Sequence, residues 1–134
     1  MPPGFALEDV TGGAPFNQPV GVAFAPGARM FVIEKDGYVW LVRDGIRQPG
    51  PLLDLNREVL SNIERGLLGI AVDPGFEENG YIYLNYSVDH DGTGDWDRTD
   101  AFARVTRYTV TFGDPDTIDP ASRFVVLGET FSTG

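Results

Sequence analysis

The feature that most constrains the fold is an internal repeat. Gly21-Val22-Ala23-Phe24-Ala25-Pro26-Gly27 is matched by Gly69-Ile70-Ala71-Val72-Asp73-Pro74-Gly75, at an offset of 48 residues, and an aromatic-rich segment follows each copy. A period of about 40 to 50 residues with several strands per unit is typical of β-propeller blades. A strand rich in Gly and Ala suits the innermost strand of a blade, where neighbouring sheets converge. The alternative is a chance similarity within a glycine-rich sequence.

Turn signals divide the chain into short strands. Asp36-Gly37, Asp44-Gly45, Asn79-Gly80 and Asp91-Gly92 provide the positive φ angles that tight hairpins need. Runs rich in Val, Ile, Phe and Tyr lie between these turns. The pattern predicts seven strands, at residues 20–25, 29–34, 38–42, 66–72, 81–87, 103–111 and 124–127.

One segment favours a helix. Leu55, Val59 and Ile63 recur every four residues within Asp54–Glu64, which would bury one narrow stripe of a helix. Because the segment is short, a structured loop is an equally good interpretation.

Size and composition limit the classes of function. The chain has 134 residues, enough for one ordinary domain, and no cysteine, which excludes disulfides and thiolate metal sites. Its net charge of −10 repels phosphate backbones and anionic membrane surfaces, so neither nucleic acid nor membrane is an expected partner. No stretch approaches the roughly 20 apolar residues of a membrane span.

These observations predict an all-β chain with about two incomplete blades, each a four-stranded antiparallel sheet. Residues 16–60 form the first blade and residues 61–134 the second. Residues 1–15 contain Phe5–Val10, a candidate outer strand that completes the last blade and closes the ring. A propeller needs at least four blades to close, so the remaining blades are the expected partner of this chain.

The longest motif carries a family resemblance. The run from Glu64 to Ser87, which includes Glu-Arg-Gly-Leu-Leu-Gly-Ile-Ala-Val-Asp-Pro-Gly-Phe, resembles the second blade of the glucose/sorbosone dehydrogenase family. Residues 19–24 with 31–37 resemble the family's first blade, and Arg104–Tyr108 adds to the match. The resemblance covers nearly the whole chain. It implies a six-bladed propeller of the soluble quinoprotein sugar dehydrogenases.

The resemblance also implies a chemistry. Family members bind pyrroloquinoline quinone (PQQ) over the propeller axis and oxidise a sugar or related alcohol by base-assisted hydride transfer, with calcium polarising the quinone. It places the chain in the periplasm or outside the cell. The catalytic histidine of the family belongs to the third blade, after a segment like Phe124–Glu129. No catalytic residue is therefore assigned here, and the chain alone is expected to be inactive.

Two candidate cofactor-binding residues follow from the resemblance. The sugar dehydrogenases have a Gln two residues before the Gly-Leu-Leu run, at the mouth of the axial pocket, and this chain has Glu64 there. A carboxylate accepts a hydrogen bond from a sugar hydroxyl but donates none, and it adds charge near an anionic cofactor. Family members that keep the propeller without known dehydrogenase activity also have an acidic residue there. A non-catalytic propeller that binds carbohydrate or protein is therefore the alternative. The adjacent Arg65 either meets an anionic ligand or pairs with Glu64.

An acidic loop at residues 89–100 is a candidate calcium site. It fits a twelve-residue calcium loop, with carboxylates at positions 1, 3, 9 and 12, a hydroxyl at position 5 and Gly at position 6. It ends in Asp rather than Glu and is flanked by strands rather than helices, so weak binding or a solvated acidic loop is expected. The candidate ligands are Asp89, Asp91, Thr93, Asp95, Asp97 and Asp100.

The aromatic and histidine residues are open to two interpretations. His90 is the only histidine, so a general base within this chain would have to be His90, although an exposed loop histidine is the simpler interpretation. Aromatic side chains within the strands could stack on a sugar ring or belong to the core between blades. They are Trp40, Tyr81, Tyr83, Tyr86 and Tyr108.

Overall fold

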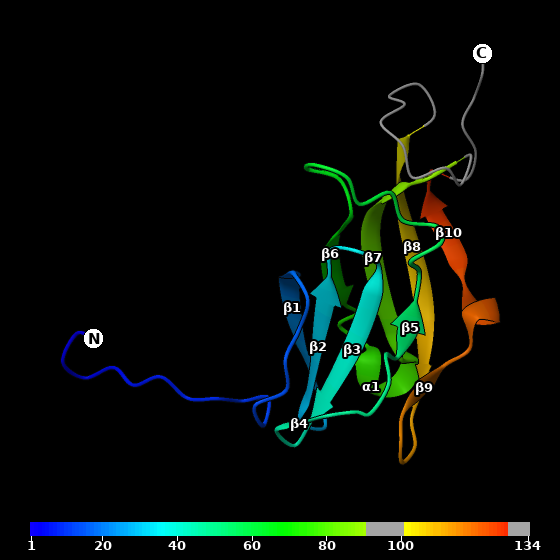
Figure 1. The fold of residues 1–134 in the computed structure, drawn as a ribbon. Helices are drawn as coiled ribbons and strands as arrows, with labels where there is room; N and C mark the ends of the chain where they lie inside the picture. The colour runs from blue at the N-terminus through cyan, green and yellow to red at the C-terminus, as the bar shows by residue number, and fades with distance from the viewer. Residues whose placement is uncertain (91–100, 129–134) are drawn as a thin grey trace.

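The computed structural model describes residues 1–90 and 101–128, and these form two antiparallel β-sheets that face each other (Figure 1). The first sheet has the order β1 (Pro19–Ala25), β2 (Arg29–Glu34), β3 (Tyr38–Arg43) and β4 (Ile46–Arg47), with β5 (Leu53–Asp54) also on β3. The second has the order β6 (Leu67–Val72), β7 (Tyr81–Val88), β8 (Phe102–Thr111) and β10 (Phe124–Leu127), with β9 (Thr117–Ile118) on β8. The all-β prediction is confirmed.

All seven predicted strands are present, with boundaries that differ by at most one residue. The elements that the sequence did not indicate are short: β4, β5, β9, a single helical turn α1 (Phe76–Asn79) and a 3₁₀ turn (Pro120–Ser122). Two or three residues are too few to show a periodic pattern, so only pairing with a neighbour defines these elements.

Asp54 ends β5 and residues 55–64 form a loop, so the helical interpretation is wrong and the loop interpretation is correct. Leu55 and Val59 are buried as the pattern indicated, but Ile63 is 57% exposed. The backbone of the segment bonds to itself in one turn, where the Val59 N–H donates to Leu55 O (3.0 Å), and otherwise to other parts of the chain: the Leu55 N–H donates to Gly37 O (2.8 Å) and the Leu60 N–H to Ser87 O (2.9 Å). The segment therefore makes one such turn, and tertiary hydrogen bonds take the place of a longer helical ladder.

The main core lies between the two sheets. The first sheet contributes alternate residues of β2 and β3, and the second contributes alternate residues of β7 and β8, as period-two strands require. At their inner edges β1 and β6 contact each other. The buried side chains are Phe31, Ile33, Val39 and Leu41 on one side and Ile82, Leu84, Tyr86, Tyr108 and Val110 on the other.

The strand register shows that the repeat extends from β1 and β6 into the strands that pair with them. Ala23 pairs with Phe31 in the first sheet, and the equivalent Ala71 pairs with Tyr83 in the second. Phe31 in turn pairs with Leu41, whereas Tyr83 pairs with Arg107. Equivalent positions face the same way in successive sheets, so Tyr83 and Arg107 lie on the face of the second sheet that points away from the first.

A buried ion pair joins the two sheets at one end. The Asp116 carboxylate, in the loop before β9, accepts bonds from Arg29 Nε (2.6 Å) and Arg43 Nη1 (3.3 Å) of the first sheet, and its side chain is 0% exposed. The Arg29 guanidinium also lies over the Phe112 ring, 4.7 Å from its centroid. The two sheets are therefore fixed by apolar burial and by charge.

The amino-terminal segment runs away from the body on the side of β1 (Figure 1). Phe5 is 73% exposed and Leu7 is 91% exposed, and the ring-closing role of residues 1–15 stays a prediction. Among residues 1–90 and 101–128, no helix has the length and apolar character to cross a membrane.

Candidate functional site at the entry of the inner strand

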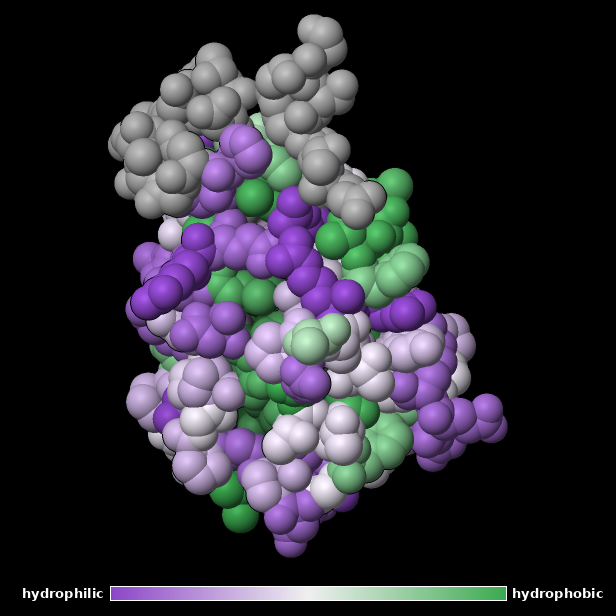
Figure 2. All heavy atoms as spheres, turned by 90° about the vertical axis from the view of Figure 1, so that its right-hand side faces the viewer, coloured by the Kyte–Doolittle hydropathy of each residue, from purple (hydrophilic) through white to green (hydrophobic). Residues whose placement is uncertain are grey.

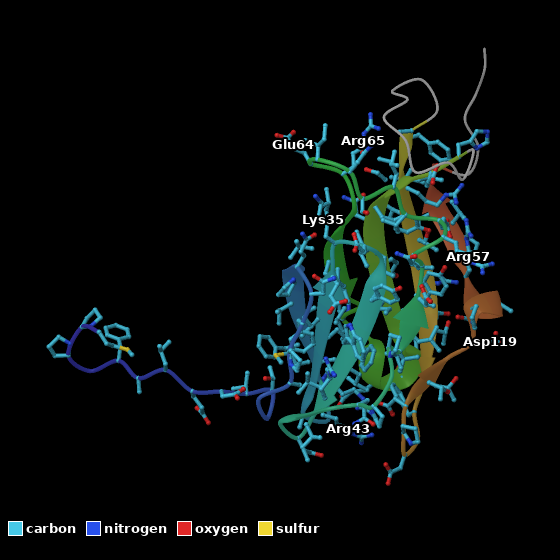
Figure 3. The ribbon with its side chains drawn as sticks, viewed as in Figure 1. Lys35, Arg43, Arg57, Glu64, Arg65 and Asp119 are labelled. Atoms are coloured by element: carbon cyan, nitrogen blue, oxygen red, sulfur yellow. The ribbon has the colours of Figure 1, made fainter. Side chains whose placement is uncertain are left out.

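The predicted cofactor residues lie in one loop. Residues 61–66 connect the first sheet's outer part to β6, and Glu64 and Arg65 project from this loop beyond the ends of the strands, with Lys35 nearby (Figure 3). Glu64 is exposed and Arg65 is half-buried. Since β6 is the edge strand that contacts β1, the loop stands where the two sheets approach each other most closely.

Lys35 fixes this loop from the first sheet. Its N–H donates to Gln18 O (3.1 Å), and its carbonyl accepts from the Leu67 N–H (2.9 Å). Its Nζ donates to Ile63 O within the loop. One residue at the end of β2 therefore holds both the loop and the first residue of β6.

Gly66 allows the chain to approach Lys35. Its φ of +148° lies outside the region that side chains ordinarily adopt, and a Cβ there would be 2.6 Å from Lys35 O. The Gly66 carbonyl accepts from the Ser87 N–H (3.1 Å), so the same residue also connects to β7. The Gly after Glu64-Arg65 is therefore a geometric requirement of this loop.

Glu64 and Arg65 do not form an ion pair with each other, and no ion pair within 4.0 Å involves either residue in the described part of the chain. The loop presents one carboxylate and one guanidinium to solvent, close to the Lys35 ammonium (Figure 3). Such a surface can accept a hydrogen bond from a hydroxyl at Glu64 and donate to an anion from Arg65.

A second polar cluster, centred on Glu58, was not predicted from the sequence. Glu58 accepts hydrogen bonds from Tyr86 Oη (2.7 Å) and Arg123 Nη2 (3.0 Å), and also pairs with Arg104. Burial raises the pKa of Tyr86, and it raises the pKa of Tyr108 to about 12. Because its members are far apart in the chain, no local motif marks this cluster, which anchors the 54–64 loop to the second sheet.

Residues 91–100, which make up most of the predicted calcium loop, lie outside the described residues. Of the candidate calcium ligands, the structure describes Asp89 alone. Asp89 is half-buried, and its N–H donates to Glu58 O (2.8 Å). His90 is exposed, with its ring 6.1 Å from the Phe102 ring. In residues 1–90 and 101–128 no three His, Cys, Asp or Glu side chains are grouped to hold a metal.

The aromatic residues divide between two environments. Tyr86 and Tyr108 are buried in the core between the sheets. Trp40 is half-buried on the other face of the first sheet, under Arg47, whose Cζ is 4.3 Å from its ring. Tyr81 and Tyr83 are half-buried on the outward face of the second sheet. None of the five lies at the loop that carries Glu64.

Comparison with known proteins decides the family. Residues 16–118 match the family model described as glucose/sorbosone dehydrogenase. The chain belongs to the glucose/sorbosone dehydrogenase family. Solved structures of similar fold include the PQQ-bound form of aldose sugar dehydrogenase from Streptomyces coelicolor, with a TM-score of 0.67 and 20% identity, covering 90% of this chain and 32% of that one. An oxidoreductase from Thermus thermophilus, described as a glucose dehydrogenase, is 29% identical with a TM-score of 0.65, covering 90% and 31%.

The curated relatives of this chain include a protein whose name does not describe a dehydrogenase. Human Hedgehog-interacting protein is 33% identical over 132 residues, which cover 92% of this chain and 18% of that protein. An uncharacterized protein from Synechocystis, slr1608, is 31% identical over 78 residues, covering 53% of this chain and 19% of that one. The chain therefore spans under a fifth of these relatives and about a third of the solved dehydrogenases.

The fold comparison identifies the two sheets. They match part of a propeller, and the predicted fold class, about two incomplete blades of a six-bladed β-propeller, is confirmed. β1 and β6 are the edge strands at which the two sheets contact each other, and their role as inner strands stays a prediction.

Proposed function

We propose that this chain forms the first two blades of a PQQ-dependent sugar or alcohol dehydrogenase, and that its 61–66 loop lines the mouth of the axial pocket. The observation that supports the proposal is that Glu64 and Arg65 lie directly before β6, the edge strand that contacts β1, in a member of this family. Relatives of the same fold include a PQQ-bound sugar dehydrogenase.

The side chains at this loop suit such a ligand. PQQ carries carboxylates, for which the Arg65 guanidinium and the Lys35 ammonium are matching donors. The Glu64 carboxylate would accept a hydrogen bond from a substrate hydroxyl and so orient the sugar. When bound, PQQ supplies the quinone that accepts the hydride. The charge of Glu64 opposes an anionic cofactor, so this residue weakens binding relative to a neutral amide.

A non-catalytic propeller that binds carbohydrate or protein is the second candidate. Two observations favour it: the carboxylate at position 64, and the 33% identity with Hedgehog-interacting protein across nearly the whole chain. The two candidates differ in whether these blades support turnover in a complete ring.

A chimera separates the candidates. We would replace the first two blades of the Thermus thermophilus relative with this chain and assay dye-coupled sugar oxidation with PQQ and calcium present. The dehydrogenase proposal predicts turnover, increased several-fold by Glu64→Gln, because the amide removes the charge beside the cofactor. Glu78→Gln, an exposed change in α1, is the matched control and should have no effect. A chimera that is folded by circular dichroism but inactive with either residue at position 64 contradicts this proposal and favours the second candidate.

Two further proposals accompany this function. The oxygen ligands of the 89–100 loop would bind calcium weakly, and calorimetry that shows no difference between the native chain and an Asp89→Ala/Asp91→Ala variant contradicts that site. The protein would act in the periplasm or outside the cell, which fractionation of the source cells tests directly.

A further inference from the structure

Unfavourable backbone angles gather around Lys35, beside the loop at residues 61–66. Four non-glycine residues in the described part of the chain have a positive φ: Gln18 (49°), Ala28 (55°), Asp44 (53°) and Ile63 (50°). Ala28 and Asp44 lie in the hairpin turns between β1 and β2 and between β3 and β4, where such angles are common. Gln18 and Ile63 lie outside these hairpins, and the carbonyl of each accepts a hydrogen bond from Lys35.

Ile63 is the most unusual of the four residues. Its side chain is branched at Cβ, and a branched residue at a positive φ is an outlier that costs free energy. It lies inside a turn that the Arg65 N–H closes on Asn62 O (2.9 Å). Burial does not offset the strain, since Ile63 is 57% exposed. The conformation therefore needs another source of stabilisation.

The Lys35 side chain supplies that stabilisation. Its Nζ donates to Ile63 O, while its own backbone is fixed by Gln18 O (3.1 Å) and by the Leu67 N–H (2.9 Å). Lys35 is the only lysine of the chain, and no carboxylate in residues 1–90 and 101–128 lies within 4.0 Å of its ammonium. An ammonium has three N–H donors, so two remain for a ligand beside the loop.

The strained turn determines where Glu64 stands. Ile63 directly precedes Glu64, so a change in the Ile63 backbone angles would turn the carboxylate in another direction. Glu64 projects from the loop beyond the ends of the strands, with Lys35 behind it (Figure 3). Strain that persists at a candidate site is typical of pre-organised functional residues.

We propose that Lys35 and Ile63 form a clamp that positions Glu64 for the substrate, a role that rests on the proposed function. Lys35 is a positioning residue: it acts through the Ile63 carbonyl, and Glu64 meets the substrate hydroxyl. A carboxylate held in this way does not have to be ordered when the substrate binds. A displacement of about 1 Å can cost about 100-fold in rate, so the clamp matters for turnover.

Limited proteolysis of the 134-residue chain tests the clamp without turnover. Trypsin cleaves after arginine, and the Arg65–Gly66 bond lies at the end of the loop. We expect Lys35→Met to increase the rate of cleavage at this bond at least about tenfold, because the loop opens when the bond to Ile63 O is lost. Lys35→Arg keeps a cationic donor and should stay within about twofold of the native chain.

The Arg57–Glu58 bond is the internal reference. Arg57 is exposed on the β10 side, away from Lys35 in Figure 3, and this side faces the viewer in Figure 2, where hydrophilic residues predominate. Cleavage at this bond should be equal in the native chain and both variants. Equal cleavage at Arg65 in the native chain and Lys35→Met would overturn the clamp. Faster cleavage at both bonds would overturn it too, because it is the sign of general unfolding.

A glycine variant separates positioning from folding. Ile63→Gly removes the strain, so it should not lower the urea midpoint, yet Arg65 should be cleaved faster because glycine does not hold the turn. Ala28→Gly is the matched control, since it relieves a similar φ at the other end of β2 and should leave cleavage at Arg65 unchanged. A lower midpoint for Ile63→Gly with native cleavage at Arg65 would contradict the clamp.

Kinetics in the chimera test the role in the reaction. At saturating PQQ, Lys35→Met should lower kcat/KM for the sugar at least about tenfold, and Lys35→Arg should recover most of it. Arg57→Met removes a distant exposed cation and should have no effect. If Lys35 acts through Glu64, then Glu64→Gln should change kcat/KM by less than about twofold in the Lys35→Met background, because the effects of coupled residues do not add.

The outcomes distinguish this inference from the proposed function. Additive effects of the substitutions at positions 35 and 64 would overturn the positioning role, as would native kcat/KM in the Lys35→Met chimera. A native chimera without turnover contradicts the proposed function, and with it the role of the clamp in catalysis. The proteolysis result still decides whether Lys35 holds the loop.

Discussion

At the scale of single residues, the Asp116 carboxylate links the two sheets through buried ion pairs. Its carboxylate is fully buried, and it receives bonds from Arg29, Arg43 and the Gly113 N–H (2.9 Å). Burial alone would raise the pKa of Asp116, but the hydrogen bonds and positive charges outweigh it and leave the pKa below its usual value. Removing the Asp116 carboxylate leaves the Arg29 guanidinium buried without its counter-charge.

We predict that Asp116→Asn lowers the free energy of unfolding by about 3 to 5 kcal/mol, the usual cost of removing one partner of a buried pair. Asp114→Asn, an exposed change in the same loop, is the matched control and should cost little. Urea unfolding at neutral pH and one fixed protein concentration measures both. Equal stability of the two variants would mean that the buried pair contributes no net stability.

The pH dependence of stability gives a second prediction for Asp116. A depressed pKa in the folded state contributes stability above the unfolded value of 3.8, and that contribution is lost as the pH falls through the folded pKa. The native chain should therefore lose more stability than Asp116→Asn in urea melts carried from neutral pH to about pH 3. Parallel losses in the two proteins would contradict the assignment of this effect to Asp116.

At the scale of elements, the loop at residues 61–66 depends on one glycine. Gly66→Ala forces a Cβ against the Lys35 carbonyl at an unfavourable φ, so the loop must move or the start of β6 must separate from β2. We predict a loss of about 1 to 3 kcal/mol in the free energy of unfolding, the cost of a strained backbone residue. Gly50→Ala is the control, since a Cβ at Gly50 has no atom within 4 Å. Denaturant midpoints that coincide for the two variants would show that the close approach at Gly66 is unimportant.

At the scale of the whole molecule, the described residues of the two blades bring no histidine and no group of metal ligands to the loop that carries Glu64. The sole histidine is exposed beside Phe102, away from the loop that carries Glu64, and the described residues contain no grouped metal ligands. We predict no turnover of the 134-residue chain in a dye-coupled sugar oxidation assay with PQQ and calcium. Turnover at an enzyme-like rate, especially if it survives His90→Ala, would show that these two blades carry a complete site.

The sequence by itself determined the strands, the two-blade repeat and the family. Turn glycines and β-branched runs are local, so each strand could be predicted without its neighbours, and the 48-residue repeat revealed that the two units are equivalent. The family motif likewise located Glu64 and Arg65 before the inner strand. A short motif is enough to locate a residue relative to the start of a strand, because the direction of the chain and the two-residue period of a strand are fixed.

Only the tertiary structure decided what those positions contact. Residues 54–64 show a helical spacing, yet they make only one turn with helical hydrogen bonding, and the Leu55 and Leu60 N–H groups donate to Gly37 O and Ser87 O. A helix this short is marginal by itself, so hydrogen bonds to other parts of the chain decide the conformation. Ala71 pairs with Tyr83, and Tyr83 pairs with Arg107; this register sets which side chains of the second sheet face away from the first sheet. The partners of Asp116 and Glu58 come from distant parts of the chain. Long-range pairing of charges leaves no local sequence pattern, since only the packing of the two sheets brings these residues together.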